Sequence, residues 1–330
     1  MSEEIVKTYA VQPGCQLEVA NIRGSTHIEG WDRPEAEIRA QKRGSGEGAD
    51  MTEIEIGQEG NRLYARTRVK RTEWLGWLGM KQPAAVDYVI RVPYQCHVAT
   101  DMVSGKTEVQ GAHGGLRLST VSGDAEVADV MGDCQLKTVS GDIRARQVEG
   151  RLKVNTVSGD VKVKASQLAA LQANTVSGDL TMSTALQPDG EYSAHSVSGD
   201  FKLEVPAETR CTVAMSTVSG DLRCALPHDV LENRRGSKRY AVNGGGVTVM
   251  FSSVSGDMTM RTGEGEAAPA REPVSAAEDW SAAAEDVAPT ETPSAEGAPS
   301  TERMRILKAI ENGEMTVEEG IARLQALAGE

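Results

Sequence analysis

The middle of the chain repeats one short phrase, Val-Ser-Gly followed by Asp or Lys, eight times. The steps between successive copies are 18, 18, 18, 19, 21, 21 and 36 residues. A short, nearly fixed period with a glycine in every copy is typical of stacked repeats, in which each unit is one supersecondary element. The copies begin at Val103, Val121, Val139, Val157, Val176, Val197, Val218 and Val254.

One repeat unit contains two short strands. Apolar and polar residues alternate from Leu152 to Thr156, and the alternation resumes at Val161 after the Ser-Gly-Asp turn. Period-two alternation indicates half-buried strands, and two such strands cannot bury an apolar face alone. We therefore predict an all-β fold, a β-solenoid (β-helix) of about 18–21-residue rungs stacked ~4.8 Å apart. The chain has only two Phe, so we expect a thin core of Val, Leu, Ala and Thr without room for rings.

The glycine of each phrase suits a tight turn because glycine accepts a positive φ that other residues resist. These structural turn positions are Gly123, Gly141, Gly159, Gly178, Gly199, Gly220 and Gly256. Thr or Ser precedes the valine in seven units, and stacked hydroxyls can hydrogen-bond from rung to rung.

An Asp follows each of these glycines, and we consider the first six of these Asp residues as a column. The resulting column is Asp124, Asp142, Asp160, Asp179, Asp200 and Asp221. Like charges ~4.8 Å apart repel by roughly 0.9 kcal/mol per neighbouring pair in water, so something must offset this repulsion. We expect each carboxylate to accept hydrogen bonds within its own turn, with cation binding by the column as the alternative. Calcium needs six to eight oxygen ligands, and the Gly-Gly-x-Gly-x-Asp nonapeptide of calcium-binding rolls is absent, so we predict no metal site.

Composition divides the chain into four parts. Residues 1–100 read as irregular rungs and an N-terminal cap, and residues 101–262 as the regular solenoid. Residues 263–300 read as a disordered acidic linker, because Ala, Pro, Glu, Ser and Thr dominate there. Residues 301–330 read as a small α-helical hairpin.

The N-terminal part contains strands of its own. The run ending in Arg23-Gly24-Ser25 looks like a degenerate first rung, and residues 54–69 alternate around a Gly60-Asn61 turn as a hairpin does. Another strand begins at Val86 and stops at Pro93. We expect this block to cover the open end of the solenoid, since an exposed edge invites strand pairing.

One stretch of the N-terminal part combines aromatic and basic residues. Its apolar members are Trp74, Leu75, Trp77 and Leu78, in a tip that runs from Trp74 to Met80. Arg66, Arg68, Lys70 and Arg71 precede them. Such a tip suits contact with a partner protein or a membrane interface, and folding back onto the cap is the alternative.

The 36-residue step has two interpretations. It contains a basic run from Pro227 to Tyr240, followed by three glycines that begin at Gly244. We interpret it either as one rung with a long basic loop or as two rungs with one degenerate turn.

The C-terminal residues carry two apolar stripes at helical spacing. They are Met304, Leu307 and Ile310, and then Ile321, Leu324 and Leu327. A hairpin of about 30 residues is too small to bury a stable core alone, so these stripes require a partner. Self-association is the simplest expectation, and docking on another protein or on a membrane is the alternative.

Charge, cysteine and histidine exclude several function classes. The net charge is −13, but ten acids and one base lie between Thr262 and Glu302, so the acidity belongs to the tail and we expect no nucleic-acid partner. The five Cys have no paired spacing, which argues against disulfides or zinc. The five His show no metal-ligand spacing, and there is no nucleophile motif. We predict no catalytic residue and no cofactor.

The start of the sequence, Met1-Ser2-Glu3-Glu4, lacks the basic and apolar pattern of a signal peptide. No apolar run approaches the ~20 residues of a membrane span. We therefore expect a cytoplasmic protein, with peripheral membrane contact left open.

The repeated Thr-Val-Ser-Gly-Asp phrase resembles a bacterial β-strand-repeat family of candidate adhesins of unknown function. The resemblance covers about residues 15–262 and includes Asn21–Gly24, Val86–Pro93 and the three glycines from Gly244. The C-terminal segment resembles the short helical domain often found in such proteins. The resemblance implies a β-solenoid and, in some members, a link to envelope stress.

These observations favour a non-enzymatic β-solenoid scaffold or binding protein, adhesin-like, with a C-terminal association module. The first alternative is a peripheral membrane or envelope-stress sensor that uses the Trp74–Met80 tip. The second is a carbohydrate-active β-helix enzyme, since some β-helices cleave polysaccharides.

Overall fold

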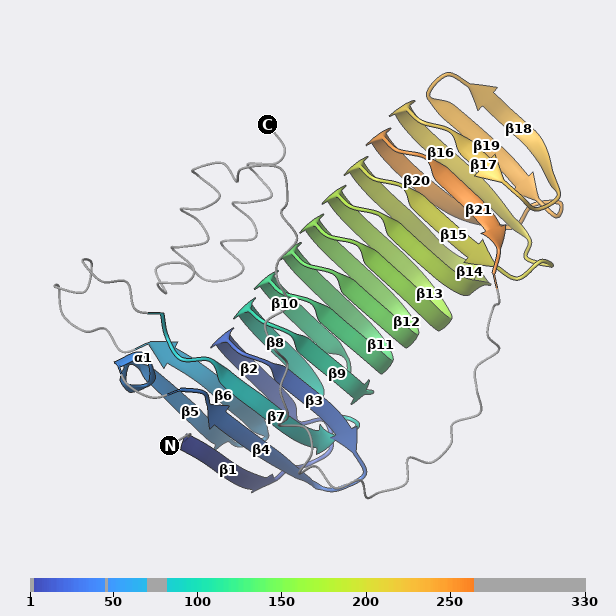
Figure 1. Cartoon of the computed structure of the whole chain (residues 1–330). Helices are drawn as coiled ribbons and strands as arrows, with labels where there is room; N and C mark the ends of the chain where they lie inside the picture. Colours follow the sequence, from blue (N-terminus) through green and yellow to red (C-terminus); the bar gives the residue numbers. More distant parts are fainter. Residues whose placement is uncertain (1–2, 45–46, 70–81, 264–330) are drawn as a thin grey trace.

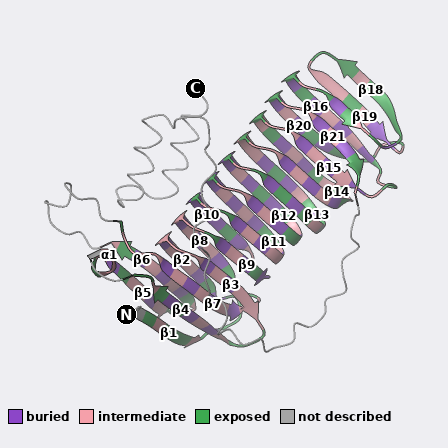
Figure 2. Ribbon diagram, in the orientation of Figure 1, coloured by how far each residue is buried: buried purple, intermediate pink, exposed green. Residues whose placement is uncertain are grey.

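The chain forms a rod of stacked rungs (Figure 1). The computed structural model describes residues 3–44, 47–69 and 82–263. Each rung has two strands, which in the regular part of the rod meet at a Ser-Gly-Asp turn, and successive rungs build two faces around a buried interior (Figure 2). All 21 strands join into one sheet, because several strands bend from one face to the other without a break. The predicted all-β class is confirmed, whereas the predicted linker and helical hairpin lie outside the described residues.

The middle rungs stack in parallel and in register. Thr138 pairs with Thr156, and Ser140 pairs with Ser158, so each residue lies beside its equivalent in the next copy. The extra residues of longer repeats are absorbed at the corner opposite the Ser-Gly-Asp turn, where the pairing shifts between Ala165 and Leu168. The strands are β8 (His97–Ser104), β9 (Thr107–Ala112), β10 (Leu116–Ser122), β11 (Ala125–Ser140), β12 (Ile143–Ser158), β13 (Val161–Ser177), β14 (Leu180–Ser198) and β15 (Phe201–Val205).

The N-terminal end is closed by antiparallel strands. β6 and β7 form the outermost parallel rung, and the first rung of the chain, β2 with β3, lies between it and β8 with β9. β5 pairs antiparallel with β6, β4 with β7, and β1 with β4. The elements are β1 (Glu3–Ala10), β2 (Gln16–Arg23), β3 (Thr26–Trp31), β4 (Glu35–Lys42), α1 (Glu47–Met51), β5 (Thr52–Glu59), β6 (Arg62–Val69) and β7 (Val86–Pro93). The run that ends at Ser25 is part of the rung of β2 and β3, and the predicted hairpin is β5 with β6.

The C-terminal end has the same arrangement in reverse. The last rung of the chain, β20 with β21, pairs on one side with β14 and β15 and on the other with β16 and β17. β19 then pairs antiparallel with β16, and β18 with β19. The strands are β16 (Cys211–Ser219), β17 (Leu222–Cys224), β18 (His228–Arg234), β19 (Ser237–Val242), β20 (Val247–Ser255) and β21 (Met258–Thr262). The 36-residue step thus agrees with the first interpretation, one rung with a long basic loop, but the loop is a hairpin of β18 and β19 and the rung is inserted between two earlier ones, which we did not anticipate.

The core is mostly aliphatic, as expected, but the expectation that it has no rings is wrong. Phe201 and Phe251 are both buried, with ring centroids 5.6 Å apart. Tyr192 is buried at the enlarged corner of a 21-residue unit, where its hydroxyl donates to the Leu168 carbonyl at 2.7 Å and accepts from the Gln187 amide at 2.8 Å. A ring is accommodated there because its polar end satisfies backbone groups of the corner.

Candidate functional site at the Ser-Gly-Asp turns

The turn glycines form one column along the rod. Their φ angles run from 123° at Gly178 to 156° at Gly220, a region that side chains rarely adopt. A Cβ built on Gly159 would lie 2.2 Å from the carbonyl oxygen of Gly141 in the neighbouring rung. The column requires glycine for two reasons, backbone conformation and close stacking.

Up to three hydrogen bonds join consecutive Ser-Gly-Asp turns. Between the first two Asp-containing turns, the Gly123 amide donates to the Ser140 carbonyl at 3.0 Å, and the Ala125 amide donates to the Asp142 carbonyl at 2.9 Å. The third runs in the opposite sense, from the amide of Asp142 to Oδ1 of Asp124 at 2.9 Å. The carboxylate therefore completes the hydrogen-bond ladder where the turn interrupts the strand.

The same carboxylate bond recurs along the whole aspartate column, at 2.8–3.1 Å. Our expectation that each Asp accepts within its own turn is therefore corrected. The reason is that the amides on either side of the Asp already donate to the carbonyls of the next rung. In order from the N-terminal end, the acceptors are Asp124, Asp142, Asp160, Asp179, Asp200 and Asp257, and the last donor is Asp221.

The column has a further member that the sequence did not reveal. At the outer N-terminal rung, Asp87 Oδ1 accepts from the Ser25 amide at 2.8 Å and from the Ser25 hydroxyl at 2.7 Å. Asp87 also pairs with the guanidinium of Arg43. Asp87 lies outside any Ser-Gly-Asp phrase, so only the pairing of β7 beside β3 identifies it.

Besides Asp87, four more column carboxylates have a cation beside them. Arg144 Nη2 is 3.1 Å from Asp142, Lys202 Nζ is 3.2 Å from Asp179, and Arg223 Nη2 is 3.2 Å from Asp257. Lys238, from the basic run predicted in the 36-residue step, pairs with Asp221. These pairs and the backbone amides offset the repulsion between stacked carboxylates.

Two pKa values reflect these contacts. The hydrogen bond from the Asp200 amide and, to a smaller extent, the contact with Lys202 lower the pKa of Asp179. The Lys238 ammonium lowers the pKa of Asp221, at the exposed end of the column. Both carboxylates are therefore held in the ionised form that accepts the hydrogen bonds.

The hydroxyl column behaves differently from our expectation. Thr217 Oγ1 donates to the Ser219 carbonyl at 3.1 Å, within its own rung rather than across rungs. Thr120 and Thr138 have buried hydroxyls with no partner among the described residues. Thr120 and Thr138 are themselves buried, so these hydroxyls lie in the interior of the rod.

Within the described ranges, no three His, Cys, Asp or Glu side chains come together as metal ligands would. The five cysteines are free. Cys15 and Cys96 lie on neighbouring rungs, where the His97 amide donates to the Cys15 carbonyl at 2.7 Å. The Cys15 contact and burial raise the pKa of Cys96, and burial raises that of Cys134 to about 12, so both stay as thiols.

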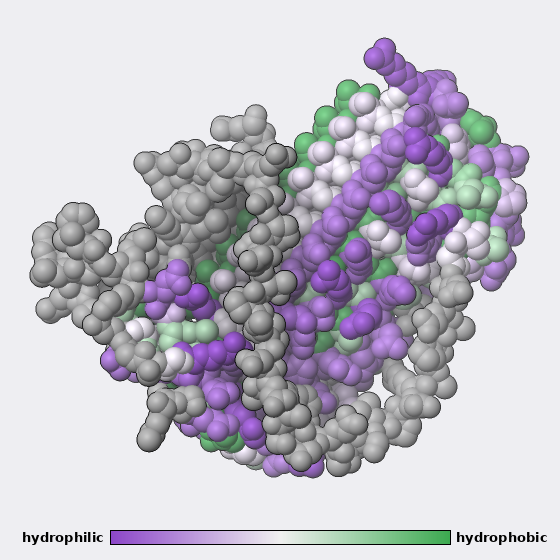
Figure 3. Space-filling model, in the orientation of Figure 1, coloured by the Kyte–Doolittle hydropathy of each residue, from purple (hydrophilic) through white to green (hydrophobic). Residues whose placement is uncertain are grey.

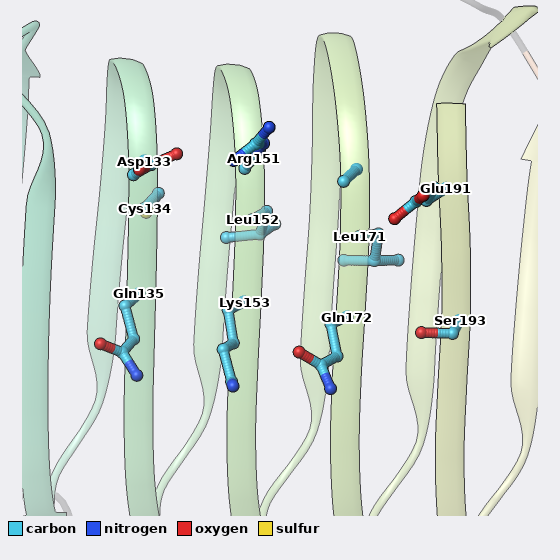
Figure 4. Close-up of a pocket in the computed structure, with 11 residues that line it drawn as sticks. Asp133, Cys134, Gln135, Arg151, Leu152, Lys153, Leu171, Gln172, Glu191 and Ser193 are labelled. Carbon is cyan, nitrogen blue, oxygen red and sulfur yellow. The ribbon is translucent and has the colours of Figure 1, made fainter. Parts of the chain in front are cut away.

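A shallow groove of about 540 Å³ crosses four rungs near the second corner (Figure 4). Gln135, Lys153, Gln172 and Ser193 form one outward row in this view, and Asp133, Arg151 and Glu191 lie nearer the corner. The row follows from the in-register pairing, which brings equivalent positions of each repeat together.

A second hollow, of about 370 Å³, lies on the N-terminal half and is lined mainly by charged residues. Glu108 lies within 2.5 Å of Lys106 and 3.1 Å of His27 Nδ1. Lys106, and then His27, lower the pKa of Glu108. This cluster is a surface ion-pair network on adjacent strands, which sequence spacing alone could not reveal.

Two groups of predicted contact residues lie outside the described residues. They are Trp74, Leu75, Trp77 and Leu78 of the tip, and Met304, Leu307, Ile310, Ile321, Leu324 and Leu327 of the C-terminal segment. In the part of the chain that is described, no helix has the length and hydropathy needed to cross a membrane.

Several solved structures are similar to the rod. A candidate adhesin of Bacteroides fragilis is 10% identical, with a TM-score of 0.44, over 78% of this chain and 97% of that one. A candidate lipid-binding protein of Parabacteroides distasonis is 10% identical, with a TM-score of 0.39, over 78% and 96%. A candidate cell adhesion protein of Clostridium sporogenes is 8% identical, with a TM-score of 0.30, over 80% and 100%. These likenesses are too distant to carry an argument about function.

No curated protein matches the chain. Two families do match it, and they divide it where the composition changes. Residues 301–330 match the SHOCT-like domain, and residues 21–261 match Toastrack DUF4097. The second match includes every Ser-Gly-Asp turn described above and most of the rod. The chain therefore belongs to the Toastrack DUF4097 family and carries a C-terminal SHOCT-like domain.

Proposed function

We propose that this protein is a non-enzymatic β-solenoid scaffold, adhesin-like in its rod, that binds other proteins or a second copy through its C-terminal domain. The proposal rests on the structural role of the carboxylates in the aspartate column. Its carboxylates accept backbone amides from the next rung and pair with Arg or Lys, as Asp179 does with Asp200 and Lys202. The most regular acidic feature of the chain thus serves the stability of the rod.

The position of the groove acids supports a binding role over glycoside cleavage. Asp133 pairs with Arg151, Arg151 with Ala170, and Ala170 with Glu191, so the two carboxylates are three rungs apart. Three steps of ~4.8 Å separate them by about 14 Å. Glycosidases place their two carboxyl groups roughly 5–9.5 Å apart, so this pair is too widely spaced for that chemistry.

The closed ends support a scaffold of fixed length. Antiparallel strands cover both ends of the rod, with β4 on β7 at one end and β19 on β16 at the other. Such strands do not offer the parallel register that another rung would need, so rods do not stack end to end. Other molecules can then bind only at the sides of the rod or at the C-terminal domain.

The test is the oligomeric state of the full chain. We expect concentration-dependent self-association at tens of micromolar by light scattering. Leu307→Asp with Leu324→Asp should make the chain monomeric while the β-sheet circular dichroism signal stays the same. A wild-type chain that is monomeric at these concentrations overturns self-association. Capture of partners by the full chain, against a chain ending at Thr262, then tests binding to other proteins.

A peripheral membrane role is the second proposal, based on the tip from Trp74 to Met80. The described part of its basic flank is already paired with carboxylates. Arg66 Nη2 is 3.2 Å from Glu18, and Arg68 Nε is 3.1 Å from Glu55. Less positive charge is therefore available for anionic lipids, which is why we rank this role below the scaffold. The free cysteines suit the reducing cytoplasm, which is the location we propose.

A further inference from the structure

Four basic side chains form a patch on one face of the rod, on the adjacent strands β12 and β13. In-register pairing places Arg144 beside Lys162 and Arg146 beside Lys164, at the inter-strand spacing of ~4.8 Å. Each of the four alternates with buried residues of its strand, so all four side chains project from the rod, and all except Arg144 are exposed. We call this group the basic patch. Figure 3 shows that hydrophilic residues cover much of the visible side of the rod.

Most of the basic patch has no counter-ion. Arg144 lies 3.1 Å from the carboxylate of Asp142. Among the described residues, Arg146, Lys162 and Lys164 take part in no ion pair. Like charges at the inter-strand spacing repel each other. The patch therefore holds three unpaired cations side by side, and an anionic ligand would relieve their repulsion.

Acidic residues limit the patch on both sides along the rod. Glu126, on β11 directly beside the patch, and Glu108, one rung further, both lie near Lys106, at 3.4 and 2.5 Å. Glu204, two rungs beyond the patch on the other side, pairs with Arg261. A wide anionic surface, such as a membrane or a nucleic-acid duplex, would also face these carboxylates. The patch therefore fits a narrow anionic chain better.

The spacing of the patch matches an extended acidic peptide. Arg144 and Arg146 are two residues apart on one strand, as are Lys162 and Lys164 on the next, so each pair spans ~6.7 Å. Side chains on one face of an extended peptide have the same period, so alternate Glu or Asp carboxylates can each meet one cation. Arg146 can bind a carboxylate through two parallel N–H donors. Ser183, beside Lys164 on the next rung, adds a hydroxyl.

We propose that the basic patch binds an acidic, extended segment of a partner protein. The patch is a second binding surface, on the side of the rod, and it goes beyond the association proposed for the C-terminal domain. The partner segment lies across β12 and β13 with its alternate carboxylates on the patch. Because these ion pairs form at the protein surface, binding is weak and falls as the salt concentration rises.

Fluorescence anisotropy with the full chain tests this contact. The probe is a labelled peptide in which Glu and Ser alternate, so that the extended conformation places every Glu on one face. The variant carries Lys162→Gln and Lys164→Gln. The matched control carries Arg151→Gln and Lys153→Gln, which remove the same charge from two exposed positions on the opposite face of β12. We expect the variant to weaken binding about fivefold and the control to weaken it less than about twofold.

Equal losses of affinity in the two variants would reduce the effect to net charge and overturn the proposal, as would a wild type that does not bind the peptide. Tighter binding of a single-stranded oligonucleotide or of phosphatidylserine vesicles, lost in the Lys162→Gln, Lys164→Gln variant, would overturn it by assigning the patch to another class of ligand. Peptide binding only by a chain that ends at Thr262 would overturn it by assigning the patch to the chain's own acidic run.

One further variant separates this inference from the proposed function. Leu307→Asp with Leu324→Asp should abolish self-association and leave the affinity for the peptide unchanged. Failure of self-association alone would reject the role of the C-terminal domain and retain the patch. Self-association without any binding of the peptide would reject the patch and retain that role.

Discussion

The backbone amide of Asp200 donates a hydrogen bond to the carboxylate of Asp179 on the neighbouring rung, at 3.0 Å. The side chain thereby supplies the acceptor that a strand carbonyl supplies elsewhere in a parallel sheet. Because the bond is charge-assisted, it is stronger than an ordinary amide-to-carbonyl bond. The turns are thus hydrogen-bonded from rung to rung, as are the strands they connect.

Removing one carboxylate of the column should destabilise the rod. We expect Asp179→Ala to lower the free energy of unfolding by about 1–3 kcal/mol, because it leaves the Asp200 amide without its acceptor. Asp179→Asn keeps an acceptor oxygen and should cost less. Thermal unfolding measures both, and equal midpoints for Asp179→Ala and the wild type would contradict the role of this bond.

Acid should weaken the column. The pKa values of Asp179 and Asp221 are lowered from the ordinary value of 3.8 in the folded chain. A carboxyl with a lowered folded-state pKa contributes stability above its unfolded value, and that stability is lost as the pH falls through the folded value. We expect the thermal midpoint to be steady between pH 7 and pH 5 and to fall below about pH 4. Asp179→Asn should reduce the size of that fall; an unchanged acid profile would argue against the contribution of Asp179.

Substitution of a turn glycine should cost more than substitution of a glycine elsewhere with a similar conformation. Gly159 (φ 126°) has a neighbouring carbonyl oxygen 2.2 Å from the added Cβ, whereas Gly132 (φ 87°) has nothing within 4 Å. We expect Gly159→Ala to lower the thermal midpoint clearly more than Gly132→Ala, and Gly159→Val to be worse still by a few kcal/mol. Equal effects at the two sites would mean that stacking adds nothing to the backbone strain.

Calcium should leave the rod unaffected. Oδ1 of each acceptor carboxylate in the column is occupied by an amide, as in Asp160 with Asp179, so too few free oxygens remain for a calcium shell. We expect millimolar calcium to leave the thermal midpoint unchanged. A midpoint that rises with the logarithm of calcium concentration is the signature of binding to the folded state and would establish a cation column instead.

Anionic vesicles should bind the protein weakly or not at all. Arg66 and Arg68 next to the tip are paired with Glu18 and Glu55, which reduces the charge available to lipid headgroups. Co-sedimentation with phosphatidylserine vesicles measures binding, with Trp74→Ala and Trp77→Ala as the paired variant. Clear sedimentation of the wild type that the variant loses would place the membrane role above the scaffold.

Local pattern was enough to predict the rungs and their turns. The alternation around Leu152 reflects the burial of one strand face, and Gly159 reflects a turn with a positive φ. Both requirements are local, so the sequence of a single repeat is enough to predict them. The strand that ends at Pro93 was predicted for the same reason.

The order of the rungs in space could not be predicted in this way. Leu180, Phe201, Met258 and Leu222 follow successive turns and occupy one buried column. All are large apolar residues, so the sequence does not specify which of them are neighbours. The hydrogen-bond acceptor of the Asp200 amide was not predicted for a related reason. Each Ser-Gly-Asp turn has the same Asp, so the sequence does not show whether its carboxylate accepts within its own rung or from the neighbouring one. The tip and the C-terminal stripe remain predictions.

The insertion of the last rung between two earlier ones has a consequence for how the chain is made. During synthesis, β16 and β17 leave the ribosome before β20 and β21, yet in the finished rod they lie outside them. The earlier rung therefore cannot take its final place when it emerges, because its neighbours β20 and β21, which separate it from β14 and β15, are still to be translated. This end of the rod is completed only when β20 and β21 insert between the rung of β14 and β15 and the rung of β16 and β17. The last strands of the rod to be synthesised are therefore needed before the earlier rung can pair in its final position.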